Sequence, residues 1–326
     1  MKKLFLVLWV FFGVFANATF LVGAGGYDLC YENGVYKGYD GKCTINQNIT
    51  SYVKKEMPNI NSISIWMTRD FDFKSWFPTE RINLDIVEKG YTPIFIIYWY
   101  RDDISPDFVQ EHEDEYFDFL QKCKVYLNKI KGKKYVILNP EYNENGVSKW
   151  EGFNDIMKKS YYILKDNNTI LGYGLGDFGN YNITFDYAAF KSFEKSFKAV
   201  KYFDFIAFQE MRAITKNSKS AILNTPYRSL EFAKYLHEKY HKPTFLAYLA
   251  ISSYMSRKLQ NEVYKRYSQL MPLFKKEANL IGFNIFHLFD RPQQVGYFSQ
   301  AEKYFGIIDK NGNKKPSYFW FLDIRE

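Results

Sequence analysis

The chain has 326 residues, 47% of them hydrophobic, so it can form one large domain or two ordinary domains with a sizeable core. Its formal net charge of +8 comes largely from lysines scattered along amphipathic segments, which argues against nucleic acid as a partner. Four histidines without a CxxC or HExxH motif give no support for a metal site, and no motif indicates another cofactor.

The N-terminal segment has the pattern of an export signal. Lys2 and Lys3 precede an apolar run over residues 4–15, and residues 16–18 (Ala-Asn-Ala) supply the small-x-small pattern that a signal peptidase cleaves. The run is shorter than the roughly 20 apolar residues that span a bilayer. We therefore expect residues 1–18 to be a signal peptide. The mature protein would be exported to the periplasm, cell envelope or exterior, without stable membrane insertion; a retained membrane anchor is the alternative.

The three cysteines fall into two groups. Cys30 and Cys43 flank a short loop rich in Gly and Tyr, "CYENGVYKGYDGKC". In an exported protein we expect them to form a disulfide, with two free thiols as the alternative. Cys123 lies in a helical pattern, and we expect it to be buried and free.

Eight short apolar runs, rich in β-branched or aromatic residues, recur along the chain. Continuous runs of this kind are typical of strands that are buried on both faces. They cover residues 19–26, 62–67, 92–100, 135–140, 169–176, 203–208, 243–250 and 280–289.

Amphipathic helical stretches separate these runs. Residues 105–132 have Ser105 as a candidate N-cap, Pro106 at the first helical position and Gly132 at the end. The runs start at intervals of roughly 30 to 43 residues, the length of a βα unit. Eight such units predict a (β/α)8 TIM barrel of the α/β class, as a single domain over residues 19–326. An open, doubly wound sheet is the competing fold, but it gives no reason for the even spacing.

In a (β/α)8 barrel the active site lies at the C-terminal mouth, the end where the carboxyl ends of the strands meet. Carboxylates, amides and aromatic rings follow the predicted strands, whereas the strand starts carry ordinary loop residues. Rings stack on the C–H face of a sugar, and polar groups bind its hydroxyls, so the mouth is predicted to bind a carbohydrate. The predicted substrate-binding residues are Trp66, Asp70, Trp99, Tyr100, Asp102, Asn139, Asn143, Gln209, Tyr248, His287 and Asp290.

Two glutamates at strand ends are the predicted catalytic residues. Glycosidic cleavage needs two carboxyl groups, one that protonates the leaving oxygen and one that acts as nucleophile or activates water. Glu141 follows the fourth predicted strand and Glu210 follows the sixth. Because Glu is a weak N-cap, helix capping does not account for either position. Rival chemistries lack their motifs, since no GxSxG elbow is present.

The stretch "ILNPEYN", residues 137–143, resembles the end of the fourth strand in the large clan of retaining (β/α)8 glycoside hydrolases. In that clan a Glu following an Asn is the general acid/base. The resemblance implies this role for Glu141, although Pro140 stands between it and Asn139. Residues 282–321 also resemble the C-terminal tail of many secreted glycosidases, with an aromatic strand followed by "KKPSY". An acid near neutrality would need a raised pKa, which an aromatic-lined site could provide.

The seventh strand departs from that clan, whose members carry the nucleophilic Glu at its end. Here no Glu or Asp occurs between Lys242 and Ser256, and Tyr248 stands at the best-matching position. Glu210 is therefore assigned as the partner of Glu141, with Asp70, Asp102 and Asp290 as second choices. The sequence predicts an exported glycoside hydrolase or transglycosylase that acts on a polysaccharide or oligosaccharide. The alternative is a non-catalytic, carbohydrate-binding barrel of the cell envelope.

Overall fold

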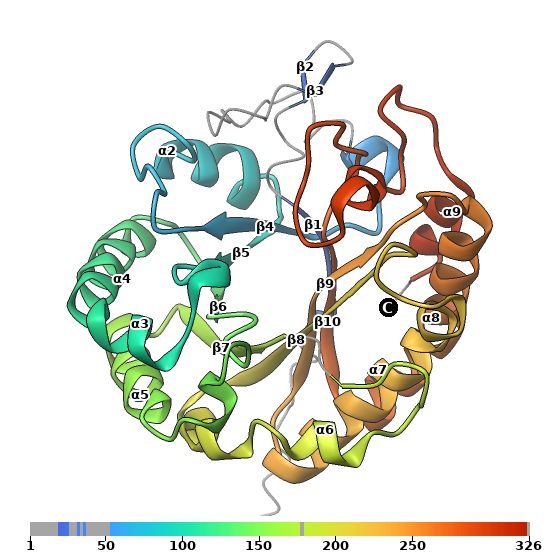
Figure 1. Cartoon of the computed structure of the whole chain (residues 1–326). Coiled ribbons are helices and arrows are strands. Elements are labelled where there is room, and N and C mark those ends of the chain that lie inside the picture. The colour runs from blue at the N-terminus through green and yellow to red at the C-terminus, as the bar shows by residue number, and fades with distance from the viewer. Residues whose placement is uncertain (1–18, 26–30, 33–34, 37–52, 177–178, 325–326) are drawn as a thin grey trace, which may run out of the picture.

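The computed structural model describes residues 19–25, 31–32, 35–36, 53–176 and 179–324. Within them eight parallel strands close into a barrel surrounded by helices (Figure 1). The predicted (β/α)8 barrel is confirmed, because one strand overlaps each predicted apolar run. In chain order the barrel strands are β1 (Leu21–Gly25), β4 (Ser62–Met67), β5 (Thr92–Ile97), β6 (Lys134–Leu138), β7 (Thr169–Leu175), β8 (Phe205–Arg212), β9 (Thr244–Ile251) and β10 (Leu280–Ile285). A hairpin of β2 (Tyr31–Glu32) and β3 (Val35–Tyr36) lies outside the barrel sheet.

Some predicted features fall outside the described residues, namely the signal peptide over residues 1–18 and the disulfide between Cys30 and Cys43. Cys123 is buried and free, as predicted. Among the described segments, no helix combines the length and the apolar character needed to cross a membrane.

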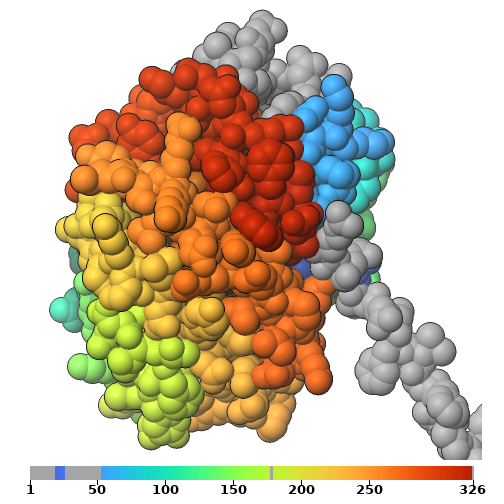
Figure 2. Space-filling model, turned by 90° about the vertical axis from the view of Figure 1, so that its right-hand side faces the viewer, coloured from blue at the N-terminus to red at the C-terminus, as the bar shows by residue number. Residues whose placement is uncertain are grey.

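The helices surround the barrel. Ser105 is the predicted N-cap, and its Oγ accepts a hydrogen bond from the backbone N–H of Phe108 at 3.1 Å. The predicted helix over residues 105–132 is divided at His112, whose backbone (φ −109°, ψ 20°) leaves the helical region. The α-helices are α2 (Thr79–Ile82), α3 (Pro106–Glu111), α4 (Glu113–Asn128), α5 (Phe153–Leu164), α6 (Tyr187–Lys191), α7 (Lys219–Tyr240), α8 (Arg257–Glu277) and α9 (Pro316–Leu322). A π-helix, η2 (Asn83–Val87), and 3-10 helices η3 (Arg101–Asp103), η4 (Val147–Lys149), η5 (Glu194–Ser196), η6 (Lys198–Tyr202) and η7 (Ser299–Tyr304) complete the layer. Figure 2 shows the C-terminal segment, in red, packed against the orange region that contains α8.

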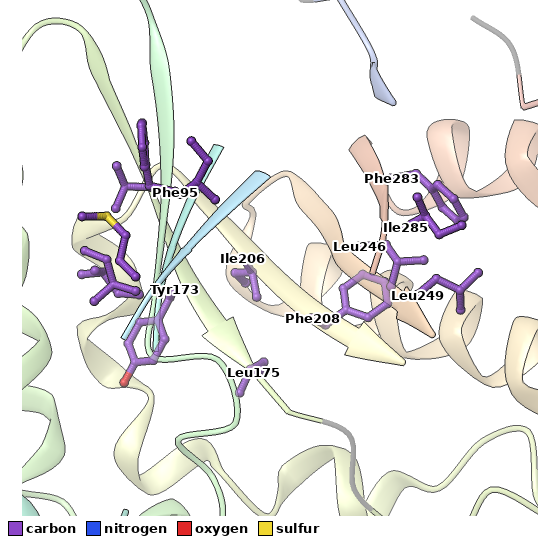
Figure 3. Close-up of a cluster of buried hydrophobic side chains, with 14 of the residues drawn as sticks. Phe95, Tyr173, Leu175, Ile206, Phe208, Leu246, Leu249, Phe283 and Ile285 are labelled. Carbon is purple, nitrogen blue, oxygen red and sulfur yellow. The ribbon is translucent and has the colours of Figure 1, made fainter. Parts of the chain in front are cut away.

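Hydrophobic residues of the described segments form two main cores, one on each side of the barrel wall, and a smaller cluster around Phe298 and Phe305. The inner core fills the barrel with side chains such as Ile96, Ile137 and Phe245. The larger outer core lies between the strands and the helices, and Figure 3 shows part of it, including Phe208 and Phe283. Side chains alternate between the two cores along each strand, as the pleat of a β-strand requires.

Strand β9 breaks this alternation at one point. Phe208 and Gln209 of β8 are consecutive, but they face Leu246 and Tyr248 of β9. The extra residue also shifts the register against β10, so both neighbours of β9 record the same irregularity. A bulge of this kind re-aims a side chain, and here Ala247 and Tyr248 both join the inner core.

Candidate active site

Glu141 lies at the mouth because the chain turns sharply after β6. Asn139 and Glu141 both have left-handed backbone conformations, with φ of +46° and +67°. Such conformations are uncommon for residues other than glycine and often mark functional sites. Gly176, after β7, leaves room for this turn, because a Cβ at that position would lie 2.9 Å from the Glu141 Cα.

The Glu141 carboxylate accepts hydrogen bonds from β8, from β9 and from the residue that directly follows β5. Its Oε1 accepts from the Gln209 Nε2 at 2.7 Å and from the Tyr248 hydroxyl at 2.6 Å. Its Oε2 accepts from the Tyr98 hydroxyl at 2.7 Å. Hydrogen bonds donated to a carboxylate stabilise its ionised form. The site therefore holds Glu141 rigidly and favours its charged state.

Aromatic rings surround this carboxylate. The Trp66 ring lies 4.9 Å from the Tyr248 ring and 5.6 Å from each of the Tyr98 and Phe286 rings, measured between centroids. Trp66 and Phe286 are half-buried, so part of each ring faces solvent. Partly exposed rings beside a carboxylate can stack on the apolar face of a sugar.

Tyr98 connects Glu141 to a second carboxylate, Asp102. The Tyr98 hydroxyl lies 2.7 Å from the Glu141 Oε2 and 2.6 Å from the Asp102 Oδ1. A phenol has one proton and can donate to only one of them, so the other contact is a hydrogen bond only if that carboxyl carries a proton. Burial, and next the Glu141 charge, raise the pKa of Tyr98 well above its ordinary value, so the phenol keeps its proton. The three groups can thus share two protons in a chain.

Neighbouring loops hold Asp102 in place. Arg69 forms an ion pair with Asp103, and Arg101 forms an ion pair with Asp70. These two ion pairs connect the loop after β4 to the loop after β5. The Asn145 Nδ2 donates to the Asp102 carbonyl at 3.1 Å from the loop after β6. Asp102 itself is exposed, so a substrate can reach it.

Glu210, the predicted partner of Glu141, faces the helices instead of the mouth. Its side chain is 1% exposed, its Oε1 accepts from the Ser229 hydroxyl of α7 at 2.8 Å, and its Oε2 pairs with Arg212 at 3.1 Å. Gln209, one residue earlier, points inward to Glu141. This placement corrects the assignment of Glu210 as the second catalytic carboxylate, because alternation along β8 directs the two side chains to opposite sides.

Trp99 and Tyr100 were expected to form stacking walls, but both pack in the outer core. They are 4% and 2% exposed. Each ring lies against Tyr116 of α4, with centroid distances of 5.6 Å and 4.6 Å. The structure thus places them beneath the mouth loops, where they support the helix layer rather than a ligand.

The two asparagines near Glu141 have structural contacts. The Asn139 Nδ2 donates to the hydroxyl of Tyr116 in α4 at 2.8 Å, and Asn139 is 2% exposed. Its side chain therefore lies on the outer side of the barrel wall, among the helices. The Asn143 Oδ1 accepts from the Gly176 N–H at 2.7 Å and fixes the loop after β6 against the end of β7. Asn139 is therefore corrected from a hydroxyl-binding residue to a positioning residue.

The remaining predicted residues divide between the surface and the interior. Asp70 is exposed and pairs with Arg101. His287 is 4% exposed; burial and the nearby Arg291 lower its pKa, so it is neutral, and both ring nitrogens are shielded from solvent. The Asp290 Oδ1 accepts from the Lys315 Nζ at 2.6 Å in a buried ion pair. His287 and Asp290 are thus buried, and the Asp290 carboxylate is paired within the protein.

Two residues of the site, Tyr98 and Phe286, were absent from the predicted set. Tyr98 follows Ile94 and Ile96 at the two-residue spacing of one strand face, and both isoleucines belong to the inner core. That alternation could have identified Tyr98 in preference to its neighbour Trp99. The same spacing could not have identified Tyr248, because the β9 bulge breaks it.

Comparisons with known proteins agree with this architecture. No family model matches the chain, and no curated protein matches it. Among solved structures, a family 26 β-mannanase from Bacteroides ovatus matches with a TM-score of 0.60 and 10% identity, over 94% of this chain and 88% of that one. An endo-β-1,4-mannanase from Thermotoga petrophila matches with a TM-score of 0.59 and 13% identity, over 95% and 77%.

A family 39 glycoside hydrolase from Bacteroides cellulosilyticus WH2 matches with a TM-score of 0.57 and 12% identity, over 94% of this chain. This chain spans 63% of that enzyme's length, so the larger protein contains parts without a counterpart here. At these identities the matches establish the fold alone. The chain has the barrel fold of glycoside hydrolases, which confirms the resemblance seen in its sequence.

Proposed function

We propose that the protein is an exported glycoside hydrolase or transglycosylase that acts on a polysaccharide or oligosaccharide. The observation that carries this proposal is the Glu141 carboxylate, held by three donors at the barrel mouth and linked through Tyr98 to Asp102. A carbohydrate suits the half-buried Trp66 and Phe286 rings beside it. The fold shared with glycoside hydrolases supports the same class of reaction.

Asp102 replaces Glu210 as the proposed second carboxyl group. The nearer oxygens of Asp102 and Glu141 lie at most about 5.3 Å apart, because one hydroxyl contacts them at 2.6 Å and 2.7 Å. Carboxyl groups about 5 Å apart are typical of retaining glycosidases, whereas inverting enzymes need roughly 6.5 to 9.5 Å. We therefore infer a double displacement with retention at the anomeric carbon.

The roles follow from the environments of the two groups. Glu141, whose charge three donors stabilise, attacks the anomeric carbon and forms a glycosyl ester. Asp102, which is open to solvent, is assigned as the general acid that gives a proton to the leaving glycosidic oxygen. Asp102 then takes a proton from an incoming water, or from a sugar hydroxyl in transglycosylation, and that oxygen breaks the ester and releases Glu141. This reverses the role that the resemblance implied for Glu141.

Substitution of the two carboxyls tests the proposal against a panel of polysaccharides and aryl glycosides. Glu141→Gln should lose about 10³-fold or more in kcat on every substrate, and Asp102→Asn about 10²-fold or more on polysaccharides. The phenol of an activated aryl glycoside departs as a phenolate and needs no proton from an acid. Asp102→Asn should therefore form the glycosyl ester from such a substrate at a nearly normal rate. Glu144→Gln, an exposed neighbour of Glu141, is the matched control. Full activity in both catalytic variants would remove the proposal.

A non-catalytic, carbohydrate-binding barrel is the second candidate. The observation in its favour is Tyr248, which stands where the resembled clan carries a nucleophilic Glu and instead donates to Glu141 at 2.6 Å. The same panel distinguishes the two candidates. If the barrel only binds carbohydrate, both the native protein and Glu141→Gln should bind oligosaccharides, and neither should produce new reducing ends.

Export is proposed on the sequence of residues 1–18 alone. Expression of the full chain in a bacterium, followed by mass spectrometry of its N-terminus, tests it. Cleavage after Ala18 with recovery outside the cytoplasm supports export. An intact N-terminus in the membrane fraction would indicate a retained anchor.

A further inference from the structure

A second pocket lies away from Glu141, where the loops after β9 and β10 meet the C-terminal segment. Its volume is about 510 Å³, within the range of small-molecule sites. Loops that follow barrel strands lie at the C-terminal face, so the pocket opens on the same face as the mouth. Its lining includes Tyr254, Arg257, Asp290, Lys303, Tyr304 and Lys310.

The two carboxylates that line the pocket already have partners within the protein. Asp290 pairs with Lys315 at 2.6 Å, and the same ammonium donates to the Ser253 Oγ at 2.8 Å and to the Gly306 carbonyl at 2.7 Å. Asp309 accepts from the backbone N–H groups of Asn311 and Asn313, both at 2.9 Å, and lies 3.7 Å from Arg257. The negative charge of the pocket is therefore compensated before a ligand arrives.

The pocket also has positive charges that its carboxylates do not neutralise. Lys303 and Lys310 both line it, and neither ammonium has an ion-pair or hydrogen-bond partner within the described part of the chain. The Lys315 ammonium donates its hydrogen bonds to protein atoms, and Arg257 lies opposite Asp309, so the ligand would meet Lys303 and Lys310. Two uncompensated ammonium groups beside one cavity favour an anionic ligand.

The pocket also offers an apolar surface. The Tyr254 and Tyr304 rings lie 5.4 Å apart and both line it. Met255, at the rim, is 82% exposed and has a left-handed backbone with φ of +60°, a costly conformation for a residue other than glycine. Tyrosine rings beside cations can bind a sugar ring and its acidic substituent together.

We propose that this pocket binds an acidic sugar unit, one that carries a carboxylate, sulfate or phosphate, of the saccharide that Glu141 cleaves. The inference rests on the proposed function and specifies its substrate class as anionic. The rings of Tyr254 and Tyr304 contact the sugar, and the ammonium groups of Lys303 and Lys310 pair with its charge. The net charge of +8, which becomes +6 once Lys2 and Lys3 are removed with residues 1–18, favours approach of the same polymer over long distances.

Calorimetric titration of the full chain carrying Glu141→Gln tests this proposal, since that variant binds without cleaving. The probes are uronic-acid oligosaccharides and neutral oligosaccharides of equal length. The acidic series should bind at least 10-fold more tightly, and added salt should reduce that difference. Lys303→Gln with Lys310→Gln should remove most of the preference and leave the neutral series unaffected. The matched control is Lys129→Gln with Lys133→Gln, two exposed lysines that precede β6 at the opposite end of the barrel.

The outcomes separate this inference from the proposed function. Equal binding of the two series, or a preference that survives loss of both pocket lysines, overturns the inference and leaves the glycosidase proposal intact. An equal loss of preference in the control pair also overturns it, because general charge would then explain the binding. Failure of every oligosaccharide to bind overturns both proposals.

Discussion

Glu141 and Glu210 lie on opposite sides of the barrel wall, and their environments differ in kind. Glu210 is 1% exposed, pairs with Arg212 at 3.1 Å and accepts from Ser229 at 2.8 Å. Glu141 is half-buried at the open mouth, and its donors among the described residues include three neutral groups, on Tyr98, Gln209 and Tyr248. Both carboxylates are well bonded, so hydrogen bonding alone does not distinguish a catalytic glutamate from a structural one.

The difference lies in access and in charge. A buried carboxylate beside an arginine has its charge balanced in place, and removing it breaks an ion pair in a poorly solvated interior. A carboxylate at a mouth, held by uncharged donors, keeps its charge available to a substrate. We therefore expect Glu210 to control stability and Glu141 to control activity, and three sets of measurements test that division.

The largest effect is expected from Glu210→Gln, which should lower the free energy of unfolding by about 3 to 5 kcal/mol because it breaks the buried ion pair with Arg212. Urea unfolding followed by circular dichroism measures this. The double variant Glu210→Leu with Arg212→Leu should recover much of the loss, since both charges of the buried pair are then removed together. Glu141→Gln should change stability by less than about 1 kcal/mol.

Activity per folded molecule completes this first test. The folded fraction of Glu210→Gln should hydrolyse substrate at nearly the native rate. A Glu210→Gln protein with native stability and no activity would reverse the division and return Glu210 to the catalytic pair.

The next effect concerns Tyr98→Phe, which removes the hydroxyl between Glu141 and Asp102. That hydroxyl favours the state in which one carboxyl is ionised and the other protonated, the state that a double displacement needs. We expect kcat/KM at the optimum to fall about 100-fold, or about 2.7 kcal/mol, and the active pH range to narrow from both sides. A merely structural tyrosine would lower the rate without changing the shape of the pH profile.

Much of the fold could be predicted from the sequence, because the property that identifies a buried strand is local. A continuous apolar run such as residues 92–100 is buried on both faces whatever its partners are. The order of eight such runs then leaves few alternatives to a barrel. Cys123 and the Ser105 cap were predictable for the same reason, since each depends on a few neighbouring residues.

The candidate site was predictable only where strand alternation persists to the strand end. It persists in β5 and β8, so Tyr98 and Gln209 follow the inner face, and Trp99 and Glu210 follow the outer face. It fails after β6, where left-handed backbone at Asn139 redirects the chain, and in β9, where the bulge turns Tyr248 inward. These changes depend on backbone angles and strand register, which residue types alone do not specify.

The smallest effects are expected from removing one hydroxyl at each site, that of Ser229 beside Glu210 and that of Tyr248 beside Glu141. These substitutions compare the two sites with the least change to the surrounding structure. Ser229→Ala should cost about 1.5 kcal/mol of stability, because a buried carboxylate loses one donor, and should leave kcat/KM unchanged. Tyr248→Phe should lower kcat/KM about 10-fold and change stability little, because solvent can reach Glu141 from the mouth. Parallel unfolding curves and rate measurements on the two variants distinguish these outcomes. If Tyr248→Phe loses stability and keeps its rate, the hydrogen bonds around Glu141 serve the fold, and the binding-only barrel becomes the better description.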